Sequence, residues 1–243
     1  MHTLYDIETQ LPAFLHITEA SVHDSKVMIE IPYEPGFYYI FDRGYNNFKM
    51  LYKIHQIEVY FVVRAKKNLQ YKSIKWTRRL PKNVFSDASV LLTGFYSKQY
   101  YPEKLRLVKY WDEEQKREFI FITNATHISA LQVAELYKNR WQVELFFKWL
   151  KQHLKIKRFW GTTEYAVRIQ IYAAICAYCL VAIIQHDMQL DRSTYEVLQI
   201  LSISLTDKTH LRETSLIKLN FKMTKNDSDQ MGQVYLIFNL SQF

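Results

Sequence analysis

Glycine, proline and cysteine are all scarce in this sequence. It has five glycines and five prolines in 243 residues, and it lacks the glycine-rich loop that cradles phosphates in many nucleotide-binding proteins. The two cysteines, Cys176 and Cys179, lie inside an apolar run. One Cys-x-x-Cys pair supplies only half of a zinc site, so we expect buried free thiols, as in proteins of a reducing compartment.

Long apolar runs and a secretory leader are also missing. The longest apolar run, residues 171–184, is about 14 residues long, whereas about 20 are needed to span a bilayer. We therefore expect a core helix there and no membrane partner. Residues 1–6 have neither a basic start nor an apolar run, so no signal peptide is expected. These absences predict a cytoplasmic protein.

Apolar bulk and positive charge are what the sequence does contain. Apolar residues make up 49% and aromatic residues 16% of the chain, which predicts a folded protein and not a disordered tail. The length allows one sizeable core or two small ones. A formal net charge of +8 and a pI near 9.2 favour an anionic partner, either nucleic acid or an anionic membrane.

A strand, a turn and a helix are predicted over residues 37–55. Residues 37–41 are all apolar, which is typical of a strand buried on both faces in a parallel sheet. Asp42 follows directly, at the carboxyl end of the strand, where open α/β sheets place their functional groups. The alternative is that Asp42 only makes an Asx turn. A second buried strand is predicted over residues 58–64.

Basic side chains dominate residues 64–82. The stretch carries eight lysines and arginines, no acidic residue, and the interleaved aromatics Tyr71 and Trp76. This composition favours contact with nucleic-acid phosphates and stacked bases, and the alternative is a solvated surface. The candidate DNA-binding residues of the stretch are Lys66, Lys67, Arg78 and Arg79.

Strands are predicted through residues 88–124, most clearly as a hairpin of residues 105–111 and 118–123. Helices are predicted over residues 164–186 and 194–205. We interpret the β-rich part as an insertion that divides an α/β core. The predicted order is core, insertion, core and C-terminal tail, at residues 1–64, 65–125, 126–206 and 207–243.

A helix that begins near Ala130 carries a polar stripe. Ser129 and Gln132 form a capping box at its start, and we expect it to end near residues 155–159. At about 100° per residue, its polar groups fall on one narrow side of an otherwise apolar helix. They are Tyr137, Arg140, Glu144, Lys148 and Lys151. The stripe suits a metal-dependent site on a polyanion, and the alternative is a ladder of surface ion pairs.

Two carboxylates on different elements, Asp42 and Glu144, suggest a hard divalent cation. Mg²⁺ takes carboxylate oxygens and keeps water and substrate phosphate as its other ligands. Two such ions can activate a water and stabilise the leaving oxygen of a phosphodiester. Arg140, Lys148 and Lys151 would then hold the charged backbone of DNA.

The spacing of these residues matches a known signature. Tyr137-x2-Arg140-x3-Glu144-x6-Lys151 resembles the Tyr-Arg-Glu-Lys signature of the DDE transposases of bacterial insertion sequences, the IS-four family. Residues 41–45, Phe-Asp-Arg-Gly-Tyr, look like the block around the second catalytic Asp of that family. The similarity covers at least residues 1–190.

The resemblance implies an RNase H-like α/β core with a β-rich insertion and C-terminal helices. It implies cleavage at transposon ends with Mg²⁺ or Mn²⁺, followed by transfer of the freed 3′ end to target DNA in a synaptic complex of two copies. Asp42 and Glu144 would be the catalytic metal ligands, and Tyr137, Arg140 and Lys151 would contact transposon-end DNA. The protein would work in the bacterial cytoplasm, at the nucleoid.

The sequence departs from the family pattern at the first of three catalytic carboxylates. In the family, a segment like residues 2–6 follows the first core strand, so this chain is expected to lack that strand. Neither Asp6 nor Asp24 fits the missing position. We expect a gap, an exposed edge or a substitute strand beside residues 37–42, because unpaired buried backbone groups cost about 1–3 kcal/mol each. We also expect little or no cleavage by this chain alone.

Two other functions stay open on the sequence. An RNase H-like nuclease would share the metal chemistry and would not bind a specific inverted-repeat end. A degenerate, non-catalytic DNA-binding fragment would bind DNA in a salt-dependent way and would show no metal-dependent cutting.

Overall fold

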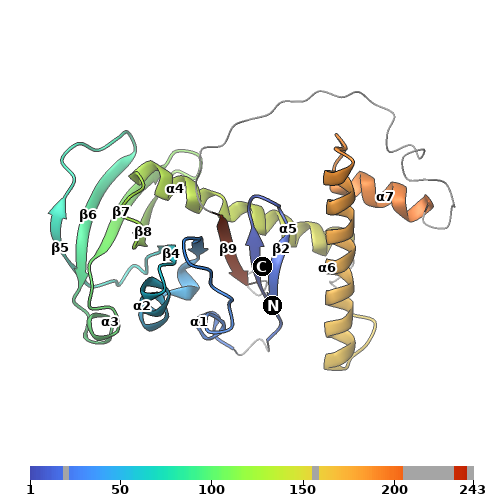
Figure 1. Ribbon diagram of the computed structural model, residues 1–243, viewed down its shortest axis with the longest axis horizontal. Coiled ribbons are helices and arrows are strands. Elements are labelled where there is room, and N and C mark those ends of the chain that lie inside the picture. Colours follow the sequence, from blue (N-terminus) through green and yellow to red (C-terminus); the bar gives the residue numbers. More distant parts are fainter. Residues whose placement is uncertain (19–21, 155–158, 205–232, 240–243) are drawn as a thin grey trace. The chain divides into compact units, whose positions relative to one another are not determined.

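A computed structural model describes four stretches of the chain, residues 1–18, 22–154, 159–204 and 233–239. The chain forms two compact units, Met1–Glu144 with Met231–Phe243, and Leu145–Gln230. Among the described residues, the first unit holds a mixed sheet of nine strands in the order β2-β1-β9-β3-β4-β8-β7-β6-β5 (Figure 1). The sheet and its helices confirm the predicted α/β class.

Strands β3 (Tyr38–Phe41) and β4 (Tyr60–Arg64) are parallel neighbours within this sheet. The short 3-10 helix η1 (Arg43–Tyr45) and helix α2 (Phe48–Gln56) connect them. The side chain of Asn47 caps α2. All four residues of β3 are buried, as expected for a strand covered on both faces. The predicted strand, turn and helix are therefore confirmed.

Strand β9 (Val234–Asn239) is the other neighbour of β3. It runs parallel to β3 and antiparallel to β1 (His2–Asp6), which pairs in turn with β2 (Pro12–His16). Figure 1 shows β9 in dark red beside the blue β1. Of the three outcomes expected beside residues 37–42, the structure has a substitute strand. Three of its residues are buried: Tyr235, Leu236 and Ile237.

The residues between β4 and the next long helices extend the same sheet. Four antiparallel strands follow, and the last of them in the chain, β8, pairs with β4. The hairpin of β7 and β8 confirms the predicted one, and α3 (Phe95–Tyr100) lies between β6 and β7. The strands are β5 (Tyr71–Trp76), β6 (Val84–Leu92), β7 (Leu105–Asp112) and β8 (Arg117–Thr123). The predicted domain boundaries at residues 64, 125 and 206 stay predictions.

Helices α4 (Ala130–Lys138) and α5 (Arg140–His153) follow β8, and the predicted capping box is present at the start of α4. The prediction of one continuous helix is wrong at Asn139. There the Gln142 N–H donates to the Asn139 carbonyl at 2.9 Å, three residues back, so the chain tightens locally. The predicted helix end near residues 155–159 lies mostly outside the described residues.

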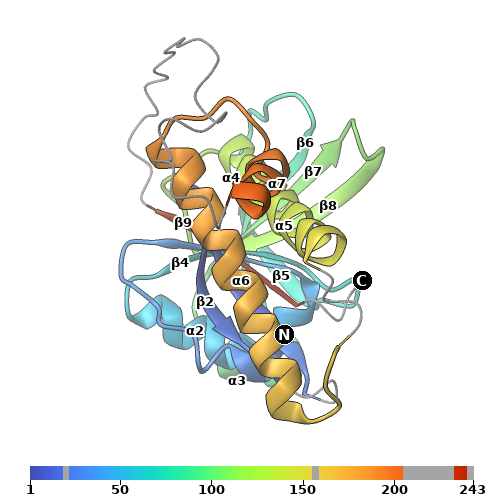
Figure 2. The same cartoon turned by 90° about the vertical axis from the view of Figure 1, so that its right-hand side faces the viewer.

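The second unit contains α6 (Glu164–Asp187) and α7 (Thr194–Ser204), which confirm both predicted helices (Figures 1 and 2). Helix α6 packs on α7 through a small apolar core around Val181. Tyr178 joins α6 to α5, because its ring centre lies 4.8 Å from that of Phe146.

One expectation for α6 is wrong, the burial of both of its thiols. The helix is 24 residues long because it extends beyond both ends of the apolar run, and among the described helices it alone has the length and composition to cross a bilayer. Of the residues in its most apolar stretch, 28% are buried. Both cysteines are free, as expected, but Cys176 is exposed while Cys179 is partly buried. Residues three apart point about 60° apart around a helix, so one thiol faces solvent.

Candidate active site

Asp42 lies directly after β3, at the carboxyl end of the strand. Its backbone carbonyl accepts the Tyr45 N–H at 3.1 Å, which begins η1. Its side chain makes no capping bond to η1. Instead, Oδ1 accepts a hydrogen bond from the Tyr137 hydroxyl at 3.0 Å. The geometry therefore disagrees with a simple Asx turn and directs the carboxylate toward α4.

The Asn46 side chain links the turn after Asp42 to the end of β4 by hydrogen bonds. Its Nδ2 donates to the carbonyls of Arg43 and Arg64, both at 2.8 Å. Tyr45, in the same turn, is fully buried. The backbone on the carboxyl side of Asp42 is thus held by a side-chain bridge between two segments, so the carboxylate projects from a fixed point.

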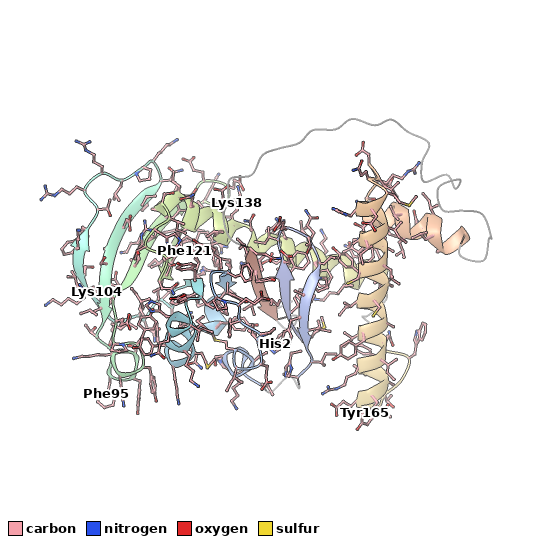
Figure 3. All side chains as sticks on the ribbon, viewed as in Figure 1. His2, Phe95, Lys104, Phe121, Lys138 and Tyr165 are labelled. Atoms are coloured by element: carbon pink, nitrogen blue, oxygen red, sulfur yellow. The ribbon has the colours of Figure 1, made fainter. Side chains whose placement is uncertain are left out.

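Tyr137 is a buried residue of α4, only 5% exposed. Its ring packs against Phe119 and Phe121 of β8, with ring centres 5.6 and 4.7 Å away. Phe121 projects from β8 toward α4 (Figure 3). Burial raises the pKa of the Tyr137 hydroxyl above its usual value, and the nearby Asp42 charge raises it further. Tyr137 is therefore a neutral hydrogen-bond donor to Asp42 at physiological pH.

Arg140 and Glu144 form an ion pair one turn apart on α5. Their side chains are only 15% and 13% exposed, so they are not the solvent-exposed pair that a surface ladder would contain. The Arg140 guanidinium carbon lies 5.7 Å from the centre of the Tyr137 ring. Contacts therefore run unbroken from Asp42 through Tyr137 and Arg140 to Glu144, all within the first unit.

Two carboxylates in this series suit a hard divalent cation. Mg²⁺ is often held by one or two carboxylates together with water and substrate phosphate. In the part of the chain that the structure describes, no group of three or more His, Cys, Asp or Glu side chains is placed to hold a metal. Asp42 and Glu144 are the two acids that these contacts bring into the series.

Asp6 is engaged elsewhere, at the end of β1. Its Oδ1 accepts the Glu8 N–H at 3.0 Å. Its Oδ2 accepts hydrogen bonds from the Thr9 hydroxyl and from Nε2 of Gln233, both at 2.8 Å. These bonds fix the β1–β2 turn to the residue before β9. The side chain of Asp24 lies outside the described residues.

The other predicted DNA-binding residues lie further along α5 and on either side of β5. Lys148 is exposed and Lys151 partly buried, on the part of α5 that belongs to the second unit. Four more are exposed on either side of β5 and form no ion pair with any described residue. They are Lys66, Lys67, Arg78 and Arg79. The structure thus leaves these four cations open to a partner.

Two arginines that the sequence analysis did not select lie beside the site. The guanidinium carbons of Arg64 and Arg117 are 4.9 and 4.4 Å from the centre of the Phe119 ring, which contacts Tyr137. Burial lowers the pKa of Arg64, and the neighbouring charges of Arg43 and Arg117 also lower it. Strand alternation places Arg117 and Phe119 on one face of β8, but no local pattern in the sequence brings Arg64 to them.

Known proteins resemble this chain over most of its length. The profile of the Transposase DDE domain family matches residues 1–180. A protein of Sinorhizobium fredii that carries the transposase name y4zB is 37% identical over 206 residues, which are 82% of this chain and 56% of that protein. A Geobacillus stearothermophilus protein, named as the transposase of insertion sequence element IS5377, is 32% identical over 74% of this chain and 48% of its own length.

A third relative, from Synechocystis, is named as a transposase for insertion sequence element IS4SA and is 28% identical over 87% of this chain. The chain spans about half the length of the curated relatives it matches. The family match covers well over half of the chain and includes Asp42, Tyr137, Arg140 and Glu144. The chain therefore belongs to the DDE transposases of insertion sequences.

Proposed function

We propose that this chain forms the catalytic part of a transposase that cleaves phosphodiester bonds at transposon ends and joins the cut end to target DNA. The observation that carries the proposal is the series of contacts Asp42–Tyr137–Arg140–Glu144. It links a carboxylate at the end of β3 to a carboxylate on α5 through two residues of the family signature. Family membership supports the reaction class.

Asp42 and Glu144 would hold a Mg²⁺ or Mn²⁺ ion in this proposal. When bound, the ion supplies an activated water and neutralises charge on the leaving oxygen. The protein supplies orientation: Tyr137 donates to Asp42, and Arg140 pairs with Glu144. Partners of this kind keep metal-binding carboxylates from rotating away from the ion.

Tyr137 suits a positioning role better than direct contact with DNA. It is buried, and its hydroxyl already donates to Asp42. We assign DNA contacts to Arg140, as the resemblance implies, and to six further cations, whose charges match backbone phosphates. These cations are Lys148, Lys151, Lys66, Lys67, Arg78 and Arg79.

We propose further that this chain alone cleaves DNA slowly or not at all. The described residues offer two carboxylates at the site, where the family reaction uses three. Strand β9 pairs with β3 up to Phe41 opposite Ile237, so the next residues in register are Asp42 and Phe238. Neither Phe238 nor Asn239 is an acid. A third carboxylate would have to come from outside these two strands.

The proposed partner is DNA, both transposon ends and target, bound by two copies of the chain in a synaptic complex. The net charge of +8 supports binding to a polyanion. We place the protein in the bacterial cytoplasm, at the nucleoid. Helix α6 then serves as a core helix of the second unit, packed on α5 and α7 through Tyr178 and Val181.

Metal binding and DNA cutting test the site separately. Mn²⁺ binding is measured by electron paramagnetic resonance on the whole chain. We expect Asp42→Asn and Glu144→Gln to weaken it at least tenfold, while Glu118→Gln, which changes an exposed carboxylate of β8, leaves it unchanged. Equal Mn²⁺ binding by all four proteins would show that the site is assigned to the wrong residues.

Cutting is measured on duplex DNA that carries the terminal sequence of the chain's own insertion sequence, with Mg²⁺ or Mn²⁺. We expect no more than trace product. Cutting as fast as that of a full-length relative would overturn the proposed inactivity. If Glu144→Gln then lost this cutting, the assigned site would still be supported.

A non-catalytic DNA-binding fragment is the second candidate. It is favoured by the lack of a third metal-binding side chain among the described residues. Salt-dependent DNA binding without Mn²⁺ binding at Asp42 and Glu144 would select it over the first candidate.

A further inference from the structure

Two arginines share one buried aromatic ring next to the candidate site. Arg64 ends β4 and Arg117 begins β8, and these strands are antiparallel neighbours with Arg64 opposite Phe121. Side chains alternate along β8, so Arg117, Phe119 and Phe121 share one face. Both guanidinium carbons lie within 5 Å of the centre of the Phe119 ring, at 4.9 and 4.4 Å.

Neither guanidinium group forms an ion pair with an acidic side chain in the part of the chain that the structure describes. Arg117 donates to Oε1 of Gln115, which is neutral, and Arg64 forms no ion pair there. Arg43 adds a third positive charge nearby, and burial together with these neighbours lowers the pKa of Arg64. The charge of Asp42 also reaches Arg64, but it balances only part of the positive charge of the three arginines, and five donors on each guanidinium call for acceptors.

We propose that Arg64 and Arg117 form a clamp for one backbone phosphate of the DNA strand that enters beside Asp42. The inference rests on the proposed function, because it assigns DNA as the ligand. A guanidinium group offers a planar fork that matches two phosphate oxygens. Contact with the Phe119 ring restrains each fork before the ligand arrives, so less freedom is lost on binding.

The local charge balance selects an anion of this kind. Asp42 would repel a phosphate, but Arg43, Arg64 and Arg117 outnumber it. The clamp is also reachable, since Arg117 is exposed and Arg64 is only partly buried. Phe119 touches the ring of Tyr137, and Tyr137 donates to Asp42, so the clamped phosphate would lie near the carboxylate that the proposed chemistry uses.

Salt-dependent DNA binding tests the clamp without any cutting. Fluorescence anisotropy of a labelled terminal duplex is followed across salt concentrations in EDTA, with the whole chain. The Arg64→Ala/Arg117→Ala double variant should lower the slope of log affinity against log salt by about 0.9, because it frees one phosphate, and each single variant should lower it by less. Arg64→Lys should keep the slope, because it keeps the charge, and lose affinity, because it lacks the fork. Arg168→Ala, which removes an arginine paired with Glu164 in the second unit, is the matched control and should change nothing.

The position of the phosphate is tested by neutralising one phosphate at a time with methylphosphonate. One or two positions should weaken wild-type binding several-fold and have no further effect on the Arg64→Ala/Arg117→Ala double variant. Thermal unfolding checks that each variant is folded. If Arg64→Ala unfolds, Arg117→Ala still tests the slope, and Arg64→Lys still tests the affinity that the fork provides.

The outcomes separate the clamp from the proposed function. If the wild-type chain binds DNA but the variants keep its salt slope and its methylphosphonate pattern, the clamp is wrong and the proposed function stands. If the wild-type chain does not bind the terminal duplex, both are overturned. The clamp is supported if the salt slope falls in the alanine variants and methylphosphonate substitution has no further effect on the double variant.

Discussion

Replacing Leu236 by alanine tests whether β9 is the strand that completes the sheet beside Asp42. Leu236 is fully buried, opposite Tyr5 of β1 and Ile40 of β3. Truncating a core leucine to alanine lowers the free energy of unfolding by about 2–5 kcal/mol, because apolar contacts are lost and a cavity remains. For a protein of this size, about 1 kcal/mol shifts Tm by 2–4 °C, so Tm should fall by roughly 4–20 °C.

Leu80→Ala is the matched control. Leu80 is exposed, between β5 and β6, so the same change there should alter the free energy of unfolding by no more than about 0.5 kcal/mol. Urea unfolding, followed by tryptophan fluorescence, measures both variants. If the two variants unfold alike, β9 is not a central strand, and the register that sets Phe238 opposite Asp42 must be abandoned.

Hydrogen exchange gives an independent measurement of the same strand. Strand β9 is paired on both sides, with β1 and with β3, so its amides should exchange slowly. Leu236→Ala should speed the exchange of β3 more than that of β6, which lies on the far side of β7 and β8. Fast exchange across residues 234–239 in the wild-type chain would contradict the observed topology.

Three further substitutions test the surroundings of the site. Tyr137→Phe removes the donor to Asp42 and should cost about 0.5–1.5 kcal/mol of stability. Folding raises the pKa of Tyr137 above its ordinary value of 10.0, so the stability that its hydroxyl contributes is complete below pH 10.0 and is lost as the pH rises further. Tyr137→Phe has no such group, so its free energy of unfolding should fall less than that of the wild-type chain when the pH is raised. Ser129→Ala breaks the capping box of α4 and should cost about 1 kcal/mol in urea unfolding, whereas no loss would mean that the cap is not formed. Arg106→Ala leaves the buried carboxylate of Asp87 unpaired and should cost about 3–5 kcal/mol by the same measurement, with a loss under 1 kcal/mol counting against a buried pair.

The buried pair of Arg106 and Asp87 also shows how the β-rich part supports the site. Arg106 on β7 donates to both oxygens of Asp87 on β6, at 2.8 and 2.9 Å. Its Nη1 also donates to the carbonyls of Ala125 and Ile128, which lie just before the capping box of α4. Strands β6 and β7 are therefore linked by hydrogen bonds to the start of the helix that carries Tyr137.

The contact series at the site was only partly predictable from sequence. The signature spacing selected Tyr137, Arg140 and Glu144, and the end of a wholly apolar strand selected Asp42. Their partners were not visible in the pattern: that Tyr137 donates to Asp42 depends on α4 packing over β8, and that Arg64 lies on the same ring depends on the pairing of β4 with β8.

Local patterns in the sequence were sufficient for the elements themselves. Unbroken apolar runs marked a strand buried on both faces, a capping box marked the start of α4, and alternation marked the hairpin of β7 and β8. Each of these signals depends on residues within a few positions of one another, and each reports that a face is buried without reporting what buries it.

Only the tertiary structure decided what lies beside β3. The resemblance predicted that a neighbour was missing, and local periodicity could not choose between a gap, an exposed edge and a substitute strand. Strand β9 fills the place from nearly 200 residues further along the chain, because three buried apolar residues and hydrogen bonds on both sides satisfy the exposed edges of β1 and β3 together. Such pairing between distant segments is chosen by the fit of whole surfaces, which no short stretch of sequence contains.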